Sequence, residues 1–332
     1  MMETLEEDEL CFPQLLNTSC IKPKRAQFEA MLTYITLSSI SLLTTTLNLL
    51  VIISISHFKQ LHTPTNVLLL SLAVSDFFVG LIMFFQIVLI NGCWFLGDIM
   101  CTVYQYTAYV ITSASVGTMV LISVDRYVAI CDPLHYSTKV TLKRVQVCVC
   151  VCWICSVIYQ SFLLKDNLEQ PGKYIPCSGQ CVITGDYIAG LADLFFSFIG
   201  PVTVVVVLYM RVFVVAVSQA RAMRSHVVSV TFKSTVSVTV KKSELKAALT
   251  LGVVVVIFLI CLCPYFIFIV ILTSGDTLIT ATSAAFVICL FYFNSCLNPL
   301  IYAFFYPWFR KCLKLIITLQ ILQPDSCEAN IL

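Results

Sequence analysis

The sequence has very few charged residues. Only 11% of its 332 residues are Asp, Glu, Lys or Arg, whereas a soluble domain carries roughly 25%. The N-terminus also lacks the basic segment of a cleaved secretory signal, and Glu3, Glu6 and Glu7 stand there instead. The composition therefore excludes an ordinary soluble protein, and we expect the first apolar stretch to act as its own membrane-insertion signal.

Apolar residues, 59% of the total, are gathered into seven blocks with short polar turns between them. The blocks span residues 30–56, 66–90, 99–123, 145–164, 187–210, 247–272 and 279–305. Each is long enough to cross a bilayer, and in hydrocarbon the backbone must bond within its own segment, so each block is predicted to be a helix. We expect an all-α membrane protein: an extracellular segment (1–30), a seven-transmembrane helix bundle (31–305), and a cytoplasmic segment (306–332) with a short amphipathic eighth helix.

The distribution of Lys and Arg predicts the orientation. Fifteen of the twenty lie at ends and loops that are cytoplasmic if the N-terminus is outside, as the positive-inside rule requires. We therefore predict a multi-pass plasma-membrane protein with an extracellular N-terminus. Asn17-Thr18-Ser19 then lies where N-glycosylation occurs, which makes Asn17 the candidate acceptor.

Six of the 17 cysteines fall on the outer side in that orientation, where disulfides form. They are Cys11, Cys20, Cys93, Cys101, Cys177 and Cys181. Six cysteines allow 15 pairings, and the residues alone do not choose among them. The cysteines of the fourth block are spread around its helix, so we interpret them as small apolar side chains rather than metal ligands.

Four acidic residues lie within the predicted spans or at their ends. Asp76 and Asp193 are inside the second and fifth blocks, whereas Asp125 and Glu244 stand at the cytoplasmic ends of the third and sixth. A charge in the bilayer costs at least ~2.5 to 3.5 kcal/mol, so each is a functional candidate by default.

Polar residues on other predicted helices lie at a depth similar to that of Asp76. They are Asn48, Ser115, Asn294 and Asn298. These side chains either enclose a small cation or form a hydrogen-bonded core that fixes helix packing. The residues alone leave both readings open.

Asp125-Arg126-Tyr127 places an acid beside an arginine whose charge cannot be removed. Glu244, which we expect to open the sixth helix, should come near it. An Arg126 paired with acids would clamp two helices together, and its release would open a cleft, which is what a two-state switch needs. The alternative is a simple interfacial anchor.

These landmarks fall in order along the seven blocks, and together they resemble the rhodopsin-like G-protein-coupled receptors over residues 33–314. They are Asn48, Asp76, Cys101, Asp125-Arg126-Tyr127, Trp153, Pro201 with Tyr209, Cys263-Pro264 and Asn298-Pro299-Leu300-Ile301-Tyr302. Narrower runs resemble the trace amine-associated receptors, above all Asn294-Ser295 leading to Tyr306-Pro307-Trp308-Phe309-Arg310-Lys311.

The resemblance implies several roles. It implies disulfides Cys101–Cys181 and Cys20–Cys177, a sodium site at Asp76, Ser115, Asn294 and Asn298, and no other cofactor. Arg126 would hold the inactive state and contact a heterotrimeric G protein. Tyr209 and Tyr302, the latter beside Asn298-Pro299, would rearrange on activation. Coupling to a stimulatory or olfactory G protein would raise cyclic AMP.

Two positions depart from the family's pattern. Leu262 stands where an aromatic toggle is usual, and Ala108 stands where amine receptors carry an aspartate. An ammonium needs a counter-ion in a dry pocket, and Asp193 is the remaining acid at suitable depth, eight residues before Pro201. A fish subset of the family is similar in carrying its acid on helix five.

We therefore expect Asp193 to bind the ammonium of a small volatile or water-soluble amine in an olfactory receptor. Tyr109, Tyr265, Phe266 and Tyr292, with Ala108, are the expected pocket walls. The alternative for Asp193 is an acid that faces the outer loops or caps a kink.

Other classes fit less well. A retinal protein needs a lysine in the seventh block, and residues 279–305 contain none. A transporter would show paired repeats, and an enzyme would show a grouping of catalytic residues at membrane depth. No feature indicates nucleic-acid binding. The alternatives within the fold are a receptor for a neutral or peptide ligand and a receptor with impaired signalling.

Overall fold

The computed structural model describes residues 9–15, 17–22, 27–90, 92–173, 175–182, 187–227, 235–273 and 281–331. Side chains are described for these residues except 90, 187, 219–227, 235–251, 272–273 and 281–282. Within these ranges the protein is helical and has no strand, only the isolated bridges Leu10–Ile21 and Ser19–Ser178.

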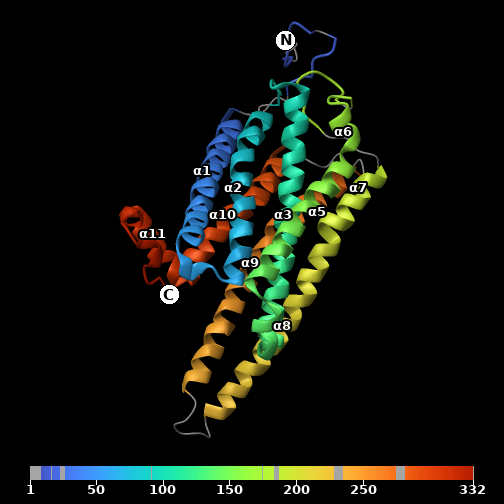
Figure 1. The fold of residues 1–332 in the computed structure, drawn as a ribbon. Coiled ribbons are helices and arrows are strands. Elements are labelled where there is room, and N and C mark those ends of the chain that lie inside the picture. Colours follow the sequence, from blue (N-terminus) through green and yellow to red (C-terminus); the bar gives the residue numbers. More distant parts are fainter. Residues whose placement is uncertain are drawn as a thin grey trace.

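Seven helical spans in the described ranges are long and apolar enough to cross a membrane, as predicted. They are α1 (Gln27–His57), α2 (Pro64–Ile90), α3 (Gly97–Cys131), α5 (Leu142–Leu163), the composite α7–η3–α8, α9 (Thr235–Thr273) and α10 (Ala281–Phe305). Short helices η1 (Lys59–Leu61), η2 (Pro133–His135), α4 (Tyr136–Lys139) and α6 (Lys165–Glu169) lie in the connections. Figure 1 shows the spans side by side, with the N-terminal segment at one end.

Several helices continue past the apolar blocks that predicted them. The third ends at Cys131 instead of residue 123, and α9 begins at Thr235 instead of residue 247. Hydropathy marks only the part of a helix that crosses hydrocarbon, and the backbone bonds continue through polar turns beyond it. In Figure 1, α8 and α9 extend past the other helices. The expectation that Glu244 opens the sixth helix is therefore wrong, and its side chain lies outside the described part.

The spans form a closed bundle. Contacts run from α1 to α2, α2 to α3, α8 to α9, α9 to α10, and α10 back to α1, while α3 also touches α5, α8 and α9. Gly80 permits the close approach of α1 and α2, since a Cβ there would lie 2.4 Å from Thr45 Oγ1. The central position of α3 places its side chains within reach of most of the bundle.

The fifth span is not a uniform α-helix. It consists of α7 (Tyr187–Asp193), a π-helical segment η3 (Leu194–Ile199) and α8 (Gly200–Val227). The Gly200 N–H donates to the Phe195 carbonyl, five residues back, as in a π-turn. Pro201 lacks an N–H, and its ring would clash with the Ser197 carbonyl in a regular α-helix. The wide turn before Pro201 relieves that clash, so the block 187–210 that was predicted as one helix is interrupted by a π-helical segment.

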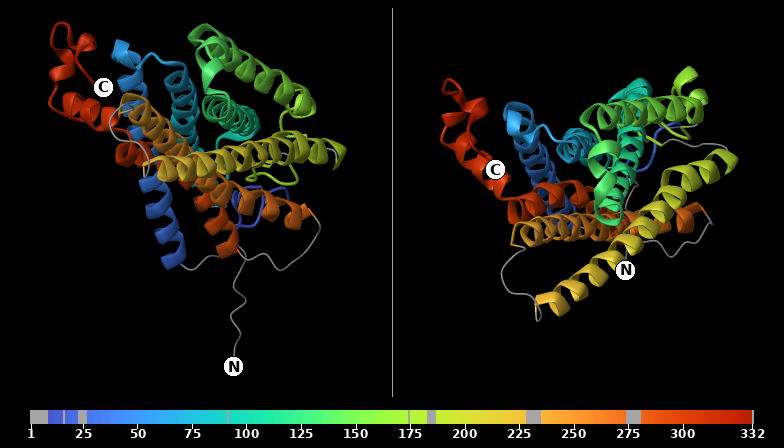
Figure 2. Two further views of the ribbon diagram at one scale, coloured as in Figure 1. Left: turned by 90° about the horizontal axis from the view of Figure 1, so that it is seen from below. Right: turned by 60° about the horizontal axis from the view of Figure 1, so that its bottom comes forward.

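After α10 the chain bends at Tyr306 into α11 (Pro307–Ile317), which lies at the periphery of the bundle (Figure 2). The helix buries Trp308, Phe309 and Cys312 and exposes Arg310 and Lys311. One face is thus apolar and the other charged, as the prediction of a short amphipathic eighth helix requires.

The tail beyond α11 returns to the end of α1. Lys59 Nζ lies 3.0 Å from Glu328 Oε1, and the Ile331 N–H donates to Gln60 Oε1 at 3.1 Å. The Ile331 side chain is only 1% exposed and joins the cluster that contains Phe58 and Leu61. We call residues 320–331, with η4 (Gln320–Leu322) and η5 (Ser326–Glu328), the tail strap.

Candidate functional site

Three disulfides tie the end of the bundle that carries the N-terminal segment, which we call the disulfide end. Cys101–Cys181 joins α3 to the loop before α7, and Cys20–Cys177 joins the N-terminal segment to the same loop. Both have the pairing that the family resemblance implies. The third, Cys11–Cys93, connects the N-terminal segment to the α2–α3 loop. The residues alone had left this pairing open.

Backbone hydrogen bonds reinforce the cross-links. The Cys20 N–H donates to the Ser178 carbonyl at 2.9 Å, and the Ser178 N–H donates back to the Thr18 carbonyl at 2.7 Å. Gly179 has a φ of +106°, and a Cβ there would lie 2.7 Å from Cys11 Cβ, so the glycine is needed both for its conformation and for space. Asn17 lies in a turn of this segment and is exposed, so the candidate acceptor is open to solvent.

Asp193 is the last residue of α7, directly before the π-helical segment, and its side chain is half-buried. Ser197 Oγ donates a hydrogen bond to Asp193 Oδ1 at 2.7 Å. No described Lys, Arg or His forms an ion pair with this carboxylate. The acid is therefore placed between helices with a polar neighbour but without a cation.

Two of the expected aromatic walls lie near Asp193. Its carboxylate is within electrostatic range of the hydroxyl groups of Tyr109 on α3 and Tyr265 on α9. Gln160 and Tyr159 of α5 are also next to it, and neither was predicted from the sequence. Ser197 was missed as well, although its place one turn after Asp193 was a signal that could have identified it.

The other expected walls lie in separate contacts. Phe266 stacks on Phe198 of the π-helical segment with ring centroids 4.1 Å apart. Tyr292 donates to Gln86 Oε1 at 3.5 Å. Ala108 is partly buried against the cluster that also contains Tyr292. The structure thus groups Tyr109 and Tyr265 with the acid and shows no contact of Phe266, Tyr292 or Ala108 with it.

Asp76 is fully buried on α2, where its Oδ2 accepts a hydrogen bond from Asn298 Nδ2 at 2.8 Å. Four buried oxygens around it have no hydrogen-bond donor among the described groups: Asp76 Oδ1, Asn48 Oδ1, Asn294 Oδ1 and Asn298 Oδ1. Of these residues only Asn294 lines a cavity of about 20 Å³, together with Ser115. Unpaired carboxylate and amide oxygens are the kind of ligand that a hard cation prefers.

Leu262 lines the same small cavity and is 3% exposed. It packs in the core cluster with Phe258 and Phe266. At the position where the family usually has an aromatic residue, leucine therefore remains a core side chain.

Arg126 lies at the opposite end of the bundle, which we call the arginine end. Its Nε donates to Asp125 Oδ2 at 2.9 Å and its Nη2 donates to Thr65 Oγ1 of α2 at 2.6 Å. Tyr136 of α4 donates to Asp125 Oδ1 at 2.8 Å. In the described part the cluster therefore holds α3 to α2 and α4, and Thr65 and Tyr136 are partners that the sequence did not reveal.

Three tyrosine hydroxyls near this cluster are buried and have no hydrogen-bond partner among the described residues. They belong to Tyr209 on α8, Tyr302 on α10 and Tyr306 after it. Tyr302 lies three residues after Pro299 inside α10. Tyr127 points elsewhere and is 37% exposed. The arginine end thus contains unsatisfied hydroxyls that a rearrangement would allow to pair.

Comparison with known proteins gives consistent results. Residues 47–302 match the model of the 7 transmembrane receptor (rhodopsin family). The chain is 36% identical over 342 residues to trace amine-associated receptor 13c of Danio rerio, covering 98% of this chain and 97% of that protein. It is 38% identical over 343 residues to trace amine-associated receptor 8a of Rattus norvegicus, covering 97% and 96%. It is 36% identical to trace amine-associated receptor 1 of Macaca mulatta, covering 96% of each.

Proposed function

Because the chain belongs to the rhodopsin family of seven-transmembrane receptors, and within it to the trace amine-associated receptors, we propose that it is a receptor for small amines in which Asp193 binds the ammonium group. The protein is a receptor rather than an enzyme. The observation that carries the proposal is a carboxylate between α3, α5 and α9 without a basic partner among the described side chains.

The surroundings of Asp193 favour a cation. The hydroxyl groups of Tyr109 and Tyr265 are within electrostatic range of the carboxylate, and ring faces attract ammonium groups in dry surroundings. A buried ammonium without a counter-ion is costly, so the acid would define where the charged end of the ligand lies. Ala108 supplies no competing charge on α3.

The proposal also assigns each end of the bundle to one side of the plasma membrane. With Lys and Arg concentrated at the arginine end, the disulfide end and Asn17 lie outside the cell at the plasma membrane. The arginine end then faces a heterotrimeric G protein of the stimulatory or olfactory type, and activation raises cyclic AMP. The cluster of Arg126 with Asp125 supports this role, since its release would expose the cleft between α3 and its neighbours.

A cyclic AMP reporter in transfected cells, screened with monoamines and diamines, tests the proposal. Asp193→Asn keeps the shape of the side chain and removes its charge. Loss of a desolvated charge pair costs 2 kcal/mol or more, so the EC50 of an active amine should rise at least about 30-fold. An unchanged response with equal surface expression would refute the assignment of Asp193.

Glu169→Gln is the matched control. Glu169 belongs to α6 at the same end of the bundle, is largely exposed, and forms only a surface ion pair with Lys165 at 3.7 Å. Such pairs contribute little. The control should therefore respond to amines as the wild type does, which separates loss of the ammonium site from a general change in surface charge.

We also propose that a sodium ion binds beside Asp76. Asp76, Asn294, Asn298 and Ser115 would hold it, and the unpaired oxygens of Asp76, Asn294 and Asn298 support the fit. The bound ion would neutralise the buried carboxylate and thereby favour the present packing of α2 against α10. Replacing sodium by N-methylglucamine should shift agonist affinity in the wild type, and this shift should be absent in Asp76→Asn.

A further inference from the structure

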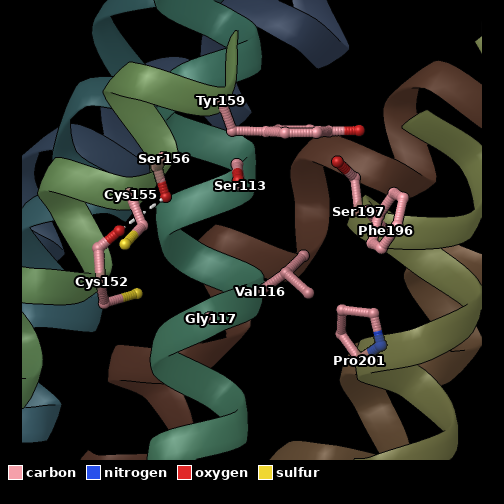
Figure 3. A pocket seen from close by; sticks show the side chains of 10 residues that line it. All are labelled: Ser113, Val116, Gly117, Cys152, Cys155, Ser156, Tyr159, Phe196, Ser197 and Pro201. Atoms are coloured by element: carbon pink, nitrogen blue, oxygen red, sulfur yellow. Dashed lines mark hydrogen bonds between the residues drawn. The ribbon is translucent and has the colours of Figure 1, made fainter. Parts of the chain in front are cut away.

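A cavity of about 390 Å³, open on one side, lies between α3, α5 and the η3–α8 part of the fifth span, and its lining includes the exposed residues Cys155 and Phe196. Figure 3 shows its three sides: Val116 and Gly117 on α3, Cys152 and Tyr159 on α5, and Phe196 with Pro201 on the fifth span. It is distinct from the small cavity lined by Ser115 and Asn294, which lies between α2, α3, α9 and α10. Its volume is at the lower end of the range for small-molecule sites.

A short polar path joins this cavity to Asp193. Ser197 lines the cavity, and its hydroxyl donates to Asp193 at 2.7 Å. Tyr159 reaches across from α5, and in Figure 3 its hydroxyl points toward the side of Ser197. That hydroxyl is buried and lies next to the Ser197 hydroxyl. Ser197 therefore connects the cavity to the acid.

The rest of the lining is uncharged. None of the ten lining residues is acidic or basic, and small side chains create the space. Gly117 lets Cys152 approach α3, since a Cβ there would lie 2.4 Å from Cys152 Sγ. A second ammonium in this cavity would have no counter-ion among the lining residues, whereas an alkyl or aryl group would make favourable contacts with its mainly apolar lining.

We propose that the uncharged body of a bound monoamine occupies this cavity while its ammonium pairs with Asp193. The inference rests on the proposed amine-receptor function and adds to it the chemical class of the ligand: one ammonium at one end of a compact alkyl or aryl group. The walls formed by α3, α5 and the fifth span then set the preferred size of that group, and Cys155, which also lines the cavity, is the position that tests it.

The first test measures whether the cavity is connected to the acid and needs no knowledge of the natural ligand. The full-length receptor in nanodiscs is treated with 2-aminoethyl methanethiosulfonate, which is cationic, or with methyl methanethiosulfonate, which is neutral. In each case the Cys155 thiolate, formed by loss of its proton to water, attacks the reagent sulfur. A mixed disulfide forms and methanesulfinate leaves. Peptide mass spectrometry gives the labelling rate of each cysteine.

The Asp193 carboxylate should increase the rate at which the cationic reagent labels Cys155, and it should not increase the rate for the neutral reagent. The ratio of cationic to neutral labelling rates should fall about tenfold in Asp193→Asn. Cys148 is the internal control, because it lies two turns away on the same face of α5, is exposed and does not line the cavity. An unchanged ratio at Cys155, or an equal fall at Cys148, would overturn the inference.

The second test fills the cavity. Cys155→Phe adds a ring to the cavity lining from the exposed face of α5, and Cys148→Phe adds the same ring elsewhere on that face. With ethylamine and 2-phenylethylamine as probes of binding to the purified receptor, Cys155→Phe should weaken the aryl amine at least about tenfold relative to ethylamine. Cys148→Phe should leave the ratio unchanged. Equal effects of the two variants would contradict the inference.

The two hypotheses fail separately. If Asp193→Asn abolishes the amine response while the Cys155 labelling ratio and the size preference stay constant, the ammonium site stands and the cavity assignment is wrong. If the amine response survives Asp193→Asn, the proposed function itself is wrong, whatever the labelling shows.

Discussion

The two ends of the bundle are held by different kinds of bond. At the disulfide end, three covalent cross-links fix the N-terminal segment, the α2–α3 loop and the loop before α7 to one another. At the arginine end, the described contacts are hydrogen bonds and one ion pair around Arg126, with tyrosine hydroxyls left unpaired. One end is built to keep its shape and the other can exchange partners.

This difference matches the two functions expected of a receptor, which are ligand binding at one end and switching at the other. A pocket must hold its walls still to select a ligand, and preorganised walls lower the entropic cost of binding. A switch must have two arrangements of similar free energy, which hydrogen bonds allow and covalent bonds do not. The predictions below perturb each end in turn.

The largest effect should come from opening the bridge at α3. Cys101 and Cys181 are 80 residues apart, and closing a loop of that size contributes about 4 to 5 kcal/mol in the chain-entropy model. The double variant Cys101→Ser with Cys181→Ser should therefore lose most of its cell-surface protein, as measured by flow cytometry. Cys148→Ser, which removes an exposed free thiol, should not. Normal surface levels of the double variant would show that the end does not depend on this bond.

At the arginine end, Asp125→Asn should leave the buried Arg126 guanidinium without its anionic partner. Removal of one partner of a buried ion pair costs about 3 to 5 kcal/mol. The arrangement in which the Arg126 cluster holds α3 to its neighbours should therefore no longer be lower in free energy than the open one. Basal cyclic AMP should rise in the absence of ligand. Unchanged basal signalling at equal surface expression would contradict the switch role.

Asp132→Asn is the control for that experiment. Asp132 follows α3 at the same end, and hydrogen bonds from Lys139 and His135 lower its pKa, so it carries the same charge at physiological pH. Because its pKa is depressed, the stabilisation from these bonds is present above its ordinary value and lost only as the pH falls below it. At neutral pH the variant removes one charge without opening the Arg126 cluster, and basal signalling should stay low.

The tail strap gives a smaller effect. Ile331→Ala removes most of a buried side chain, at a cost of about 2 kcal/mol if the site relaxes well. Amides of residues 57–61 should then exchange with deuterium roughly 30-fold faster if the strap opens. Glu328→Gln removes only the exposed ion pair with Lys59 and should leave exchange unchanged. If both variants increased exchange equally, the tail strap would be held by the Lys59–Glu328 ion pair as much as by the buried Ile331 side chain.

The smallest effect concerns the backbone at the disulfide end. Gly179→Ala forces an L side chain into a left-handed conformation, which costs about 1 to 2 kcal/mol, and places its Cβ against Cys11. The melting temperature of the purified receptor should fall. Gly190→Ala is the matched control, because a Cβ there meets nothing within 4 Å. A fall in the control alone would contradict the packing described at Cys11.

The sequence predicted the bundle well because hydrophobic length is a one-dimensional property. Seven apolar blocks gave seven spans, and the eighth helix was predicted as well. It predicted the ends of helices poorly, since α8 and α9 continue as helices beyond the apolar blocks, where hydropathy carries no signal. Glu244 was misplaced for that reason.

Contacts between distant residues were harder to predict. Asp76 and Asn298 were predicted to lie at similar depth on their helices, and the structure joins them by a hydrogen bond. Thr65 and Tyr136 are ordinary residues in polar turns, and nothing local marks them as partners of the Arg126 cluster. Cys11–Cys93 was one of 15 pairing schemes that only three-dimensional proximity can decide.

The number of residues in the π-helical segment Leu194–Ile199 determines the direction in which the Asp193 side chain points. An α-helix advances about 100° per residue, so deleting one residue from this segment would restore an even register and turn all of α7 by about that angle about its axis. The acid would then face lipid or another neighbour, although every remaining residue of the pocket was intact. Insertions and deletions in these six residues are therefore a route by which related receptors can re-aim a charge without replacing it.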